Sequence, residues 1–113
     1  MNGNMMNWDL TIPKAILHAE KYNFDGKLVS RELDGSIIST TYGDSIKRSK
    51  KLANALAKLG VNLRDRVATI AWNNSRHFET YFAVSGMGAI LHTLNPRYSP
   101  DQLIYILNHA EDE

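Results

Sequence analysis

Two short apolar runs separated by a stretch of helical period constrain the fold most. Residues 66–72 and 89–94 are mostly apolar, with little alternation of polar and apolar side chains. The first run is typical of a strand that is covered on both faces in a parallel sheet, and the second run predicts another strand. The stretch between them, 76–88, places Phe78 and Phe82 on one helical face. This order predicts a βαβ unit and therefore an α/β fold.

Further elements follow from capping residues, turn residues and apolar spacing. They are a helix at 13–21, a hairpin of strands 27–33 and 36–40, a helix capped by Thr41 and ending at Gly60, and a last helix from Pro100 to about His109. Asp34-Gly35 predicts a two-residue turn in the hairpin, because both central positions of such a turn take positive φ. The second helix is expected to be amphipathic, with an apolar side formed by Ile46, Ser49, Ala53, Leu56 and Leu59.

The last predicted helix is apolar around its whole circumference. Residues 103–107 are Leu, Ile, Tyr, Ile and Leu. On a helix they point in all directions, which is typical of a buried helix, and burial is worth roughly 1.5 to 3 kcal/mol for each large aliphatic side chain. The series of strands and helices also stops where a further parallel strand is due. The sequence therefore predicts an amino-terminal fragment of a larger α/β protein, molten or prone to aggregation when isolated.

Composition excludes several classes of protein. Hydrophobic residues are 43% and charged residues 22% of the 113, which is typical of a packed domain. A net charge of +1 provides no general attraction to nucleic acid, and the absence of cysteine excludes thiolate catalysis and cysteine-bound metals. Residues 1–7 lack the features of a signal peptide, and polar residues and glycines interrupt the longest apolar stretch, 81–94. We therefore expect a cytoplasmic protein without a transmembrane segment.

Common catalytic and cofactor-binding motifs are missing. The sequence has no phosphate loop of the G-x-x-x-x-G-K-[ST] type and no G-x-S-x-G around a serine. Gly86 and Gly88 lie late in a predicted helix, so they are interpreted as a packing or turn feature. No metal site is predicted, because no ligand spacing connects the histidines, which are His18, His77, His92 and His109.

Two polar segments follow the carboxyl ends of the predicted parallel strands, where open α/β sheets bind ligands. They are Asn73-Asn74-Ser75-Arg76 and Asn95-Pro96-Arg97. Amide groups at the start of the third helix, with Arg76 nearby, are able to hold an anion. The plainer interpretation, which we favour, is that the asparagines form turns, Ser75 caps the helix and both arginines are solvated.

A basic cluster lies on the second helix. Lys47, Arg48, Lys50 and Lys51 are opposite its apolar side and have no aromatic residues between them. Contact with a polyanion is one interpretation of such a cluster, but a solvated helix face is favoured.

Six segments together carry a family resemblance. They read KLANAL at 51–56, DRVATIAWNN at 65–74, RHFE at 76–79, VSGMG at 84–88, HTLNPR at 92–97 and NHAED at 108–112. With them, the chain resembles the beginning of an adenylate-forming acyl-CoA synthetase, of the group of medium- and long-chain fatty-acid CoA ligases and methylmercaptopropionate CoA ligases. The resemblance extends from about Trp8 onward and is weakest in the hairpin. Tyr98-Ser99 departs from the apolar pair often found after Asn-Pro-Arg in this group.

The resemblance implies that residues 1–113 are part of the large amino-terminal, AMP-binding domain of such an enzyme, ending before its phosphate loop and without its carboxyl-terminal domain. These enzymes use ATP and Mg²⁺ to convert a carboxylic acid, here a medium- or long-chain fatty acid or a similar acid, into an acyl adenylate and then into a thioester of coenzyme A. The family's catalytic, cofactor-binding and metal-binding motifs lie downstream. None of the residues is therefore assigned to a site, and the fragment alone is expected to be inactive. In relatives this part of the domain often contributes to a homodimer.

Two alternatives from other classes stay open. One is a self-contained α/β binding or regulatory module, such as a receiver-like domain, although a receiver requires an Asp where this chain has Asn73 and Asn74. The other is the remnant of a degraded gene, with an interaction role or none.

Overall fold

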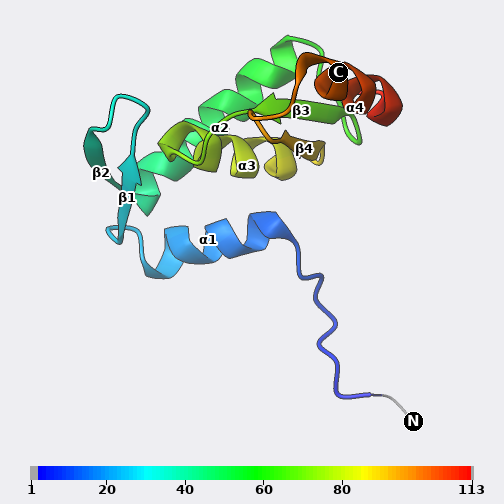
Figure 1. The fold of residues 1–113 in the computed structure, drawn as a ribbon. Helices are drawn as coiled ribbons and strands as arrows, with labels where there is room; N and C mark the ends of the chain where they lie inside the picture. The colour runs from blue at the N-terminus through cyan, green and yellow to red at the C-terminus, as the bar shows by residue number, and fades with distance from the viewer. Residues whose placement is uncertain (1–2, 113) are drawn as a thin grey trace.

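The computed structural model describes residues 3–112, which form four helices and two separate two-stranded sheets (Figure 1). The elements in chain order are α1 (Ile12–Tyr22), β1 (Lys27–Arg31), β2 (Ile37–Thr41), α2 (Tyr42–Lys58), β3 (Arg66–Ile70), α3 (Ser75–Gly86), β4 (Ile90–Leu94) and α4 (Pro100–Ala110). The segment before α1 has no helix or strand and extends away from the rest of the chain (Figure 1). The predicted mixed α/β fold is confirmed.

The predicted βαβ unit is present. β3 and β4 are parallel, in a register that runs from Arg66 opposite Ile90 to Ile70 opposite Leu94, and α3 connects them. Among residues 3–112 the strand predicted at 66–72 is only partly covered. Ile70 of β3 is 51% exposed, and Ile90 of β4 is 49% exposed.

The hairpin of β1 and β2 is antiparallel as predicted, but its turn is longer than two residues. The Glu32 N–H donates to the Ser36 carbonyl at 2.8 Å, so three residues, 33–35, lie between the two residues that this hydrogen bond joins. Gly35 has a φ of +84°, whereas Asp34 is not left-handed. The Asp34 carboxylate instead accepts hydrogen bonds from the Ser36 hydroxyl and N–H, at 2.6 and 2.9 Å. These two bonds hold the turn and lower the pKa of Asp34.

The core lies between α2 and α3, and α1 packs against both helices. Ile46 of α2 is 2% exposed, and Ala83 and Val84 of α3 are 1% and 0% exposed. Ser45 and Ser49 are also buried on α2, where the Ser49 hydroxyl donates to the Ser45 carbonyl at 2.9 Å. The small side chains allow the two helices to approach closely, and the internal hydrogen bond removes the cost of burying the Ser49 hydroxyl.

The predicted pattern of α2 is confirmed in its first half and fails at its end. Thr41 caps the helix, and its Oγ1 accepts a hydrogen bond from the Asp44 N–H at 3.1 Å. Leu59, predicted on the apolar side, is 82% exposed. Leu59 is the C-cap residue, and its N–H still donates to the Ala55 carbonyl at 3.1 Å, so its exposure is not caused by a change of backbone direction. Gly60 has the predicted left-handed conformation, with a φ of +105°.

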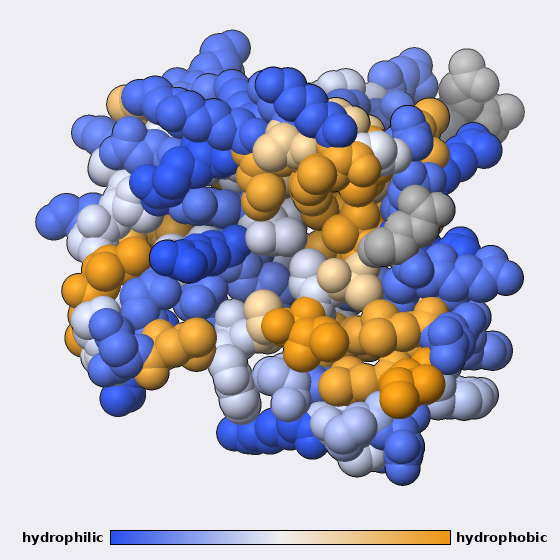
Figure 2. Space-filling view, turned by 90° about the horizontal axis from the view of Figure 1, so that it is seen from above, coloured by the Kyte–Doolittle hydropathy of each residue, from blue (hydrophilic) through white to orange (hydrophobic). Residues whose placement is uncertain are grey.

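α4 is the one helix with no buried side chain in the part of the chain that the structure describes. Ile104 and Tyr105 are 58% and 67% exposed. The predicted capping box is present, with Ser99 and Gln102 bonding to each other's N–H groups. Apolar side chains also reach the surface elsewhere, and Figure 2 shows them in several patches on one face. Ile104 and Tyr105 are thus left uncovered by residues 3–112, whereas Leu103, Ile106 and Leu107 are half-buried.

The carboxyl end of α4 turns back onto the sheet. Glu111 has a left-handed conformation, with a φ of +53°, and its carboxylate forms an ion pair of 2.9 Å with Arg66 of β3. The next residue, Asp112, brings its buried carboxylate to 2.7 Å from Nδ1 of His92 on β4. Neither contact is apparent from the spacing of residues in the sequence. They attach α4 at its end while its middle stays exposed.

Candidate functional site

The two polar segments that follow β3 and β4 lie at the same edge of the parallel pair, as predicted. The guanidinium of Arg97, after β4, lies 5.0 Å from the ring centroid of Trp72, after β3. This distance is within the range of a cation–π interaction. The structure therefore brings the two loops into contact. The polar groups of the first loop bond to a carboxylate from the hairpin, whereas those of the second loop bond within the loop.

The first loop ends in a helix cap that differs from the predicted one. Oδ1 of Asn74 accepts a hydrogen bond from the His77 N–H at 3.0 Å, so Asn74 caps α3 and Ser75 is the first helical residue. The prediction that Ser75 is the cap is wrong. Both residue types suit a cap, and the hydroxyl of Ser75 has another partner, the carboxylate of Glu32.

Glu32, from the hairpin, supplies the anion at the start of α3. Its Oε1 accepts hydrogen bonds from the Ser75 hydroxyl at 2.8 Å, from the Ser75 N–H at 3.4 Å and from the Ser30 hydroxyl at 2.9 Å. The hydroxyls of Ser75 and Ser30 lower the pKa of Glu32, and the charge of Arg76 adds to the effect. Of the amides considered for an external anion, the Ser75 N–H thus bonds to a carboxylate of the same chain. Sequence spacing misses it, because Glu32 and Ser75 lie far apart along the chain.

The second loop has no such carboxylate. Oδ1 of Asn95 accepts a hydrogen bond from the Arg97 N–H at 3.0 Å, and the carbonyl of Asn95 accepts one from the Tyr98 N–H at 3.1 Å, which confirms the predicted turn. Arg97 is exposed, and among residues 3–112 no carboxylate forms an ion pair with it. Trp72 and Tyr98 are 46% and 42% exposed beside it.

The histidines occupy separate places. His77 is 6% exposed, with Nε2 at 3.4 Å from the Thr69 hydroxyl, and His92 is partly buried, as predicted, against Asp112. His18 and His109 lie beside the rings of Tyr22 and Tyr105, respectively. Within residues 3–112 no three His, Asp or Glu side chains are grouped so that they could hold a metal ion.

The basic cluster of α2 lies on an exposed helix face, as favoured from the sequence. The Arg48 side chain is 46% exposed, and its Nε also forms an ion pair of 2.6 Å with Oε1 of Glu79 on α3, whose side chain is only 12% exposed. This ion pair, which the sequence did not predict, connects α2 to α3. Lys47 and Lys50 are exposed and pair with Asp44 and Glu20, at 3.6 and 2.7 Å.

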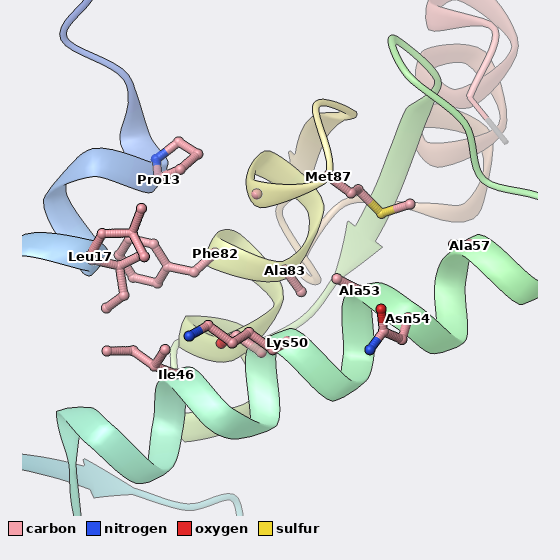
Figure 3. A pocket seen from close by; sticks show the side chains of 13 residues that line it. Pro13, Leu17, Ile46, Lys50, Ala53, Asn54, Ala57, Phe82, Ala83 and Met87 are labelled. Atoms are coloured by element: carbon pink, nitrogen blue, oxygen red, sulfur yellow. The ribbon is translucent and has the colours of Figure 1, made fainter. Parts of the chain in front are cut away.

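An apolar groove of about 550 Å³ runs between α1, α2 and α3 (Figure 3). Pro13, Leu17, Ala53, Phe82 and Met87 are among the residues that line it. Gly86 is one of the lining residues, and a Cβ added to it would meet no atom within 4 Å. Close packing against a neighbour therefore does not require a glycine at this position. Gly88 has a φ of +83° and begins the turn into β4, as predicted.

Comparisons with known proteins agree on one family. The sequence profile of the AMP-binding enzymes matches residues 18–113. The chain is 46% identical over 112 residues to a 3-methylmercaptopropionyl-CoA ligase of Ruegeria lacuscaerulensis, covering 99% of the chain and 21% of that protein. It is 45% identical over 113 residues to a medium-chain-fatty-acid–CoA ligase of Ectopseudomonas oleovorans, covering 100% of the chain and again 21% of the relative.

A solved structure shows the same fold. The crystal structure of IdnL1 matches 94% of the chain and 22% of that protein, with a TM-score of 0.82 and 17% sequence identity. The chain thus spans about a fifth of the length of the curated relatives that it matches. No helix among the described residues is long and apolar enough to cross a bilayer.

Proposed function

Because the chain belongs to the AMP-binding enzyme family, we propose that it forms the opening portion of the large domain of an acyl-CoA ligase. The observation that carries this proposal is the high identity to CoA ligases along the whole chain, 45% and 46% over 113 and 112 residues. Membership of this family also disfavours the receiver-like module, for which the chain has no phosphate-accepting Asp after β3.

The proposed reaction of the whole protein is the conversion of a carboxylic acid into its CoA thioester. A carboxylate resists nucleophilic attack because it is anionic and has no good leaving group. The carboxylate takes the adenylyl group of ATP, with Mg²⁺ offsetting charge on the departing pyrophosphate, and the resulting acyl adenylate has neither problem. The thiol of coenzyme A then takes the acyl group, and AMP leaves. A fatty acid of medium or long chain, or a similar acid, is the proposed substrate, following the names of the relatives.

The described residues serve this reaction as scaffold. Ile46, Ala83 and Val84 fix α2 against α3, and the Arg48–Glu79 ion pair crosses the same contact. None of the residues is proposed as catalytic or as a metal ligand, and residues 3–112 contain no group of acidic and histidine side chains suited to Mg²⁺. A cytoplasmic location and a homodimer, as often occurs in relatives, complete the proposal.

The first experiment is to read the nucleotide sequence beyond the Glu113 codon in frame in the source DNA. A frame that encodes a further strand and then a loop rich in Gly, Ser and Thr and ending in Lys supports the proposal. The product of that frame is then expected to exchange pyrophosphate into ATP in the presence of a fatty acid. No exchange with any acid from short to long chain would count against adenylation. A stop codon directly after Glu113 would instead support the remnant or the binding module.

A further inference from the structure

The chain contains two Asp-Gly pairs, Asp25–Gly26 and Asp34–Gly35. Such pairs are prone to an intramolecular reaction, because the glycine nitrogen directly follows a residue with a side-chain carboxyl and has no Cβ beside it to hinder its approach. Both reacting groups belong to the same chain, so the reaction requires no free surface and no partner other than water. It requires only that the backbone of the pair rotates until the nitrogen meets the carboxyl carbon.

Backbone hydrogen bonds to α2 hold the first pair on both sides. The Phe24 carbonyl accepts a hydrogen bond from the Gly43 N–H at 2.9 Å, and the Gly26 carbonyl accepts one from the Tyr42 N–H at 3.0 Å. The side chain of Asn23 also lies so close to Gly26 that a Cβ added there would overlap it. Rotation of the first pair therefore breaks its contact with the start of α2.

Bonds within the hairpin turn hold the second pair. The Gly35 N–H donates to the Glu32 carbonyl at 3.0 Å, and the Asp34 carboxylate accepts from the Ser36 hydroxyl at 2.6 Å and from the Ser36 N–H at 2.9 Å. Gly35 has a φ of +84°, and a Cβ added to it would meet no atom within 4 Å. Since none of these bonds joins the pair to a helix among residues 3–112, its backbone opens more easily than that of the first pair.

We propose that Asp34–Gly35 is a site of spontaneous isomerisation in the folded protein and that the Ser36 hydroxyl slows the reaction. The Gly35 nitrogen attacks the carboxyl carbon of Asp34, a C–N bond forms, and the carboxyl hydroxyl leaves as water with the amide proton. Water then opens the resulting cyclic succinimide at either carbonyl. Opening at the side-chain carbonyl restores aspartate, whereas opening at the main-chain carbonyl leaves isoaspartate, in which the chain continues through the β-carbon.

Ser36 acts on the first step in two ways. The hydroxyl leaves from the protonated carboxyl, and the hydroxyl and N–H of Ser36 lower the pKa of Asp34, so this form is less populated. Their hydrogen bonds also restrain the carboxyl group, which has to rotate toward the Gly35 nitrogen. The restraint on this pair thus lies in a side chain, whereas the restraint on Asp25–Gly26 lies in the backbone.

Isomerisation at this position affects the contact between the hairpin and α3. The Glu32 N–H closes the turn on the Ser36 carbonyl at 2.8 Å, and the Glu32 carboxylate accepts a hydrogen bond from the Ser75 hydroxyl at 2.8 Å. Isoaspartate adds one main-chain carbon between Glu32 and Ser36. The closing bond is therefore expected to be lost, and amide exchange in β1 and β2 is expected to accelerate in the isoaspartate fraction.

The test is an incubation, at neutral pH, of the protein encoded by the full reading frame in water labelled with heavy oxygen. Each passage through the succinimide leaves one labelled oxygen in the residue, whichever carbonyl opens, so mass spectrometry detects the reaction even where aspartate is restored. Trypsin, used afterwards in ordinary water, places the two pairs on separate peptides, 22–27 and 32–47. A parallel incubation in urea gives the rate of each pair without the fold.

The ratio of the folded to the unfolded rate is expected to be at least about tenfold larger at Asp34 than at Asp25, because only the first of these opens without loss of a contact to α2. Dividing by the rate in urea removes the effect of the neighbouring residues. Equal ratios at the two pairs, or no label at Asp34 in folded protein while the unfolded protein is labelled, would overturn the site.

Matched variants test the role of the hydroxyl. Ser36→Ala is expected to raise the labelling of Asp34 in the folded protein about threefold or more, as loss of a hydrogen bond to a charged group predicts, and to leave Asp25 unchanged. Ser36→Thr keeps a hydroxyl and is expected to leave both rates as in the parent. Equal rates in the parent and in Ser36→Ala would overturn the role of Ser36. The label is read as a mass, so the result is independent of pyrophosphate exchange and of the proposed function.

Discussion

α3 and α4 both follow a strand of the parallel pair, and both are rich in apolar residues, yet their surroundings are opposite. Val84 of α3 is 0% exposed, whereas no side chain of α4 is buried and Tyr105 is 67% exposed. α3 packs against α1 and α2, whereas the apolar residues of α4 are at most half-buried, and Glu111 and Asp112 at its end contact β3 and β4. The difference shows that the apolar content of a helix does not by itself determine how far its side chains are buried. Burial also requires neighbouring elements that pack against the helix.

The largest expected effect comes from the same substitution made on the two sides of this comparison. Ile46→Ala, in the contact between α2 and α3, is expected to lower the resistance of these helices to urea most, because it leaves a cavity that costs about 2 to 5 kcal/mol. Ile104→Ala, on exposed α4, is expected to cost less than about 0.5 kcal/mol. Urea unfolding followed by circular dichroism measures both. Equal losses would show that α4 is packed as tightly as α3.

The next effect concerns the ion pairs of the two helices. Glu79→Gln removes a charge that is 12% exposed and paired with Arg48, so a loss of about 1 to 2 kcal/mol is expected. Glu111→Gln removes a charge that is 83% exposed and paired with Arg66, and a loss of under about 0.5 kcal/mol is expected. The urea midpoints of the two variants, measured at low and at high salt, test both predictions. A larger effect at Glu111 would contradict the account.

A smaller, pH-dependent effect is expected where the hairpin meets α3. The pKa of Glu32 is lowered by the hydroxyls of Ser75 and Ser30, so its ionised form is favoured in the folded chain. The corresponding stability is present above the ordinary glutamate pKa and is lost as pH falls through the lowered pKa of the folded state. Amide exchange in β1 and β2 is therefore expected to accelerate, relative to α2, in this acidic range. Glu32→Gln is the control and is expected to remove that pH dependence.

Much of the fold is predictable from local signals in the sequence. The βαβ unit, the capping box at Ser99 and the left-handed Gly60 depend on residues close together in the chain, and each is confirmed. The errors have a common origin in distant or side-chain contacts. Ser75 does not cap α3 because Asn74 does, and its hydroxyl is bonded to Glu32.

The position of the candidate site in the fold could be predicted from the sequence, but its side-chain contacts could not. Topology alone puts the loops after β3 and β4 at one edge of the sheet, so Asn74 and Asn95 could be placed there from sequence. The pairing of Arg97 with Trp72, and the ion pair of Arg48 with Glu79, depend on how side chains from different elements meet. Periodicity assigns such residues to a face, and it carries no information on which residue lies opposite.

The central claim, that α3 has buried side chains among these residues while α4 has none, is tested most directly by residue-resolved hydrogen exchange. In the 113-residue chain, amides of α4 are expected to exchange at least about tenfold faster than those of α2 and α3, since their opening requires little loss of packing. In the longest soluble product of the reading frame, protection of α4 is expected to rise to the level of α3. Equal protection of α3 and α4 in the short chain would contradict the claim.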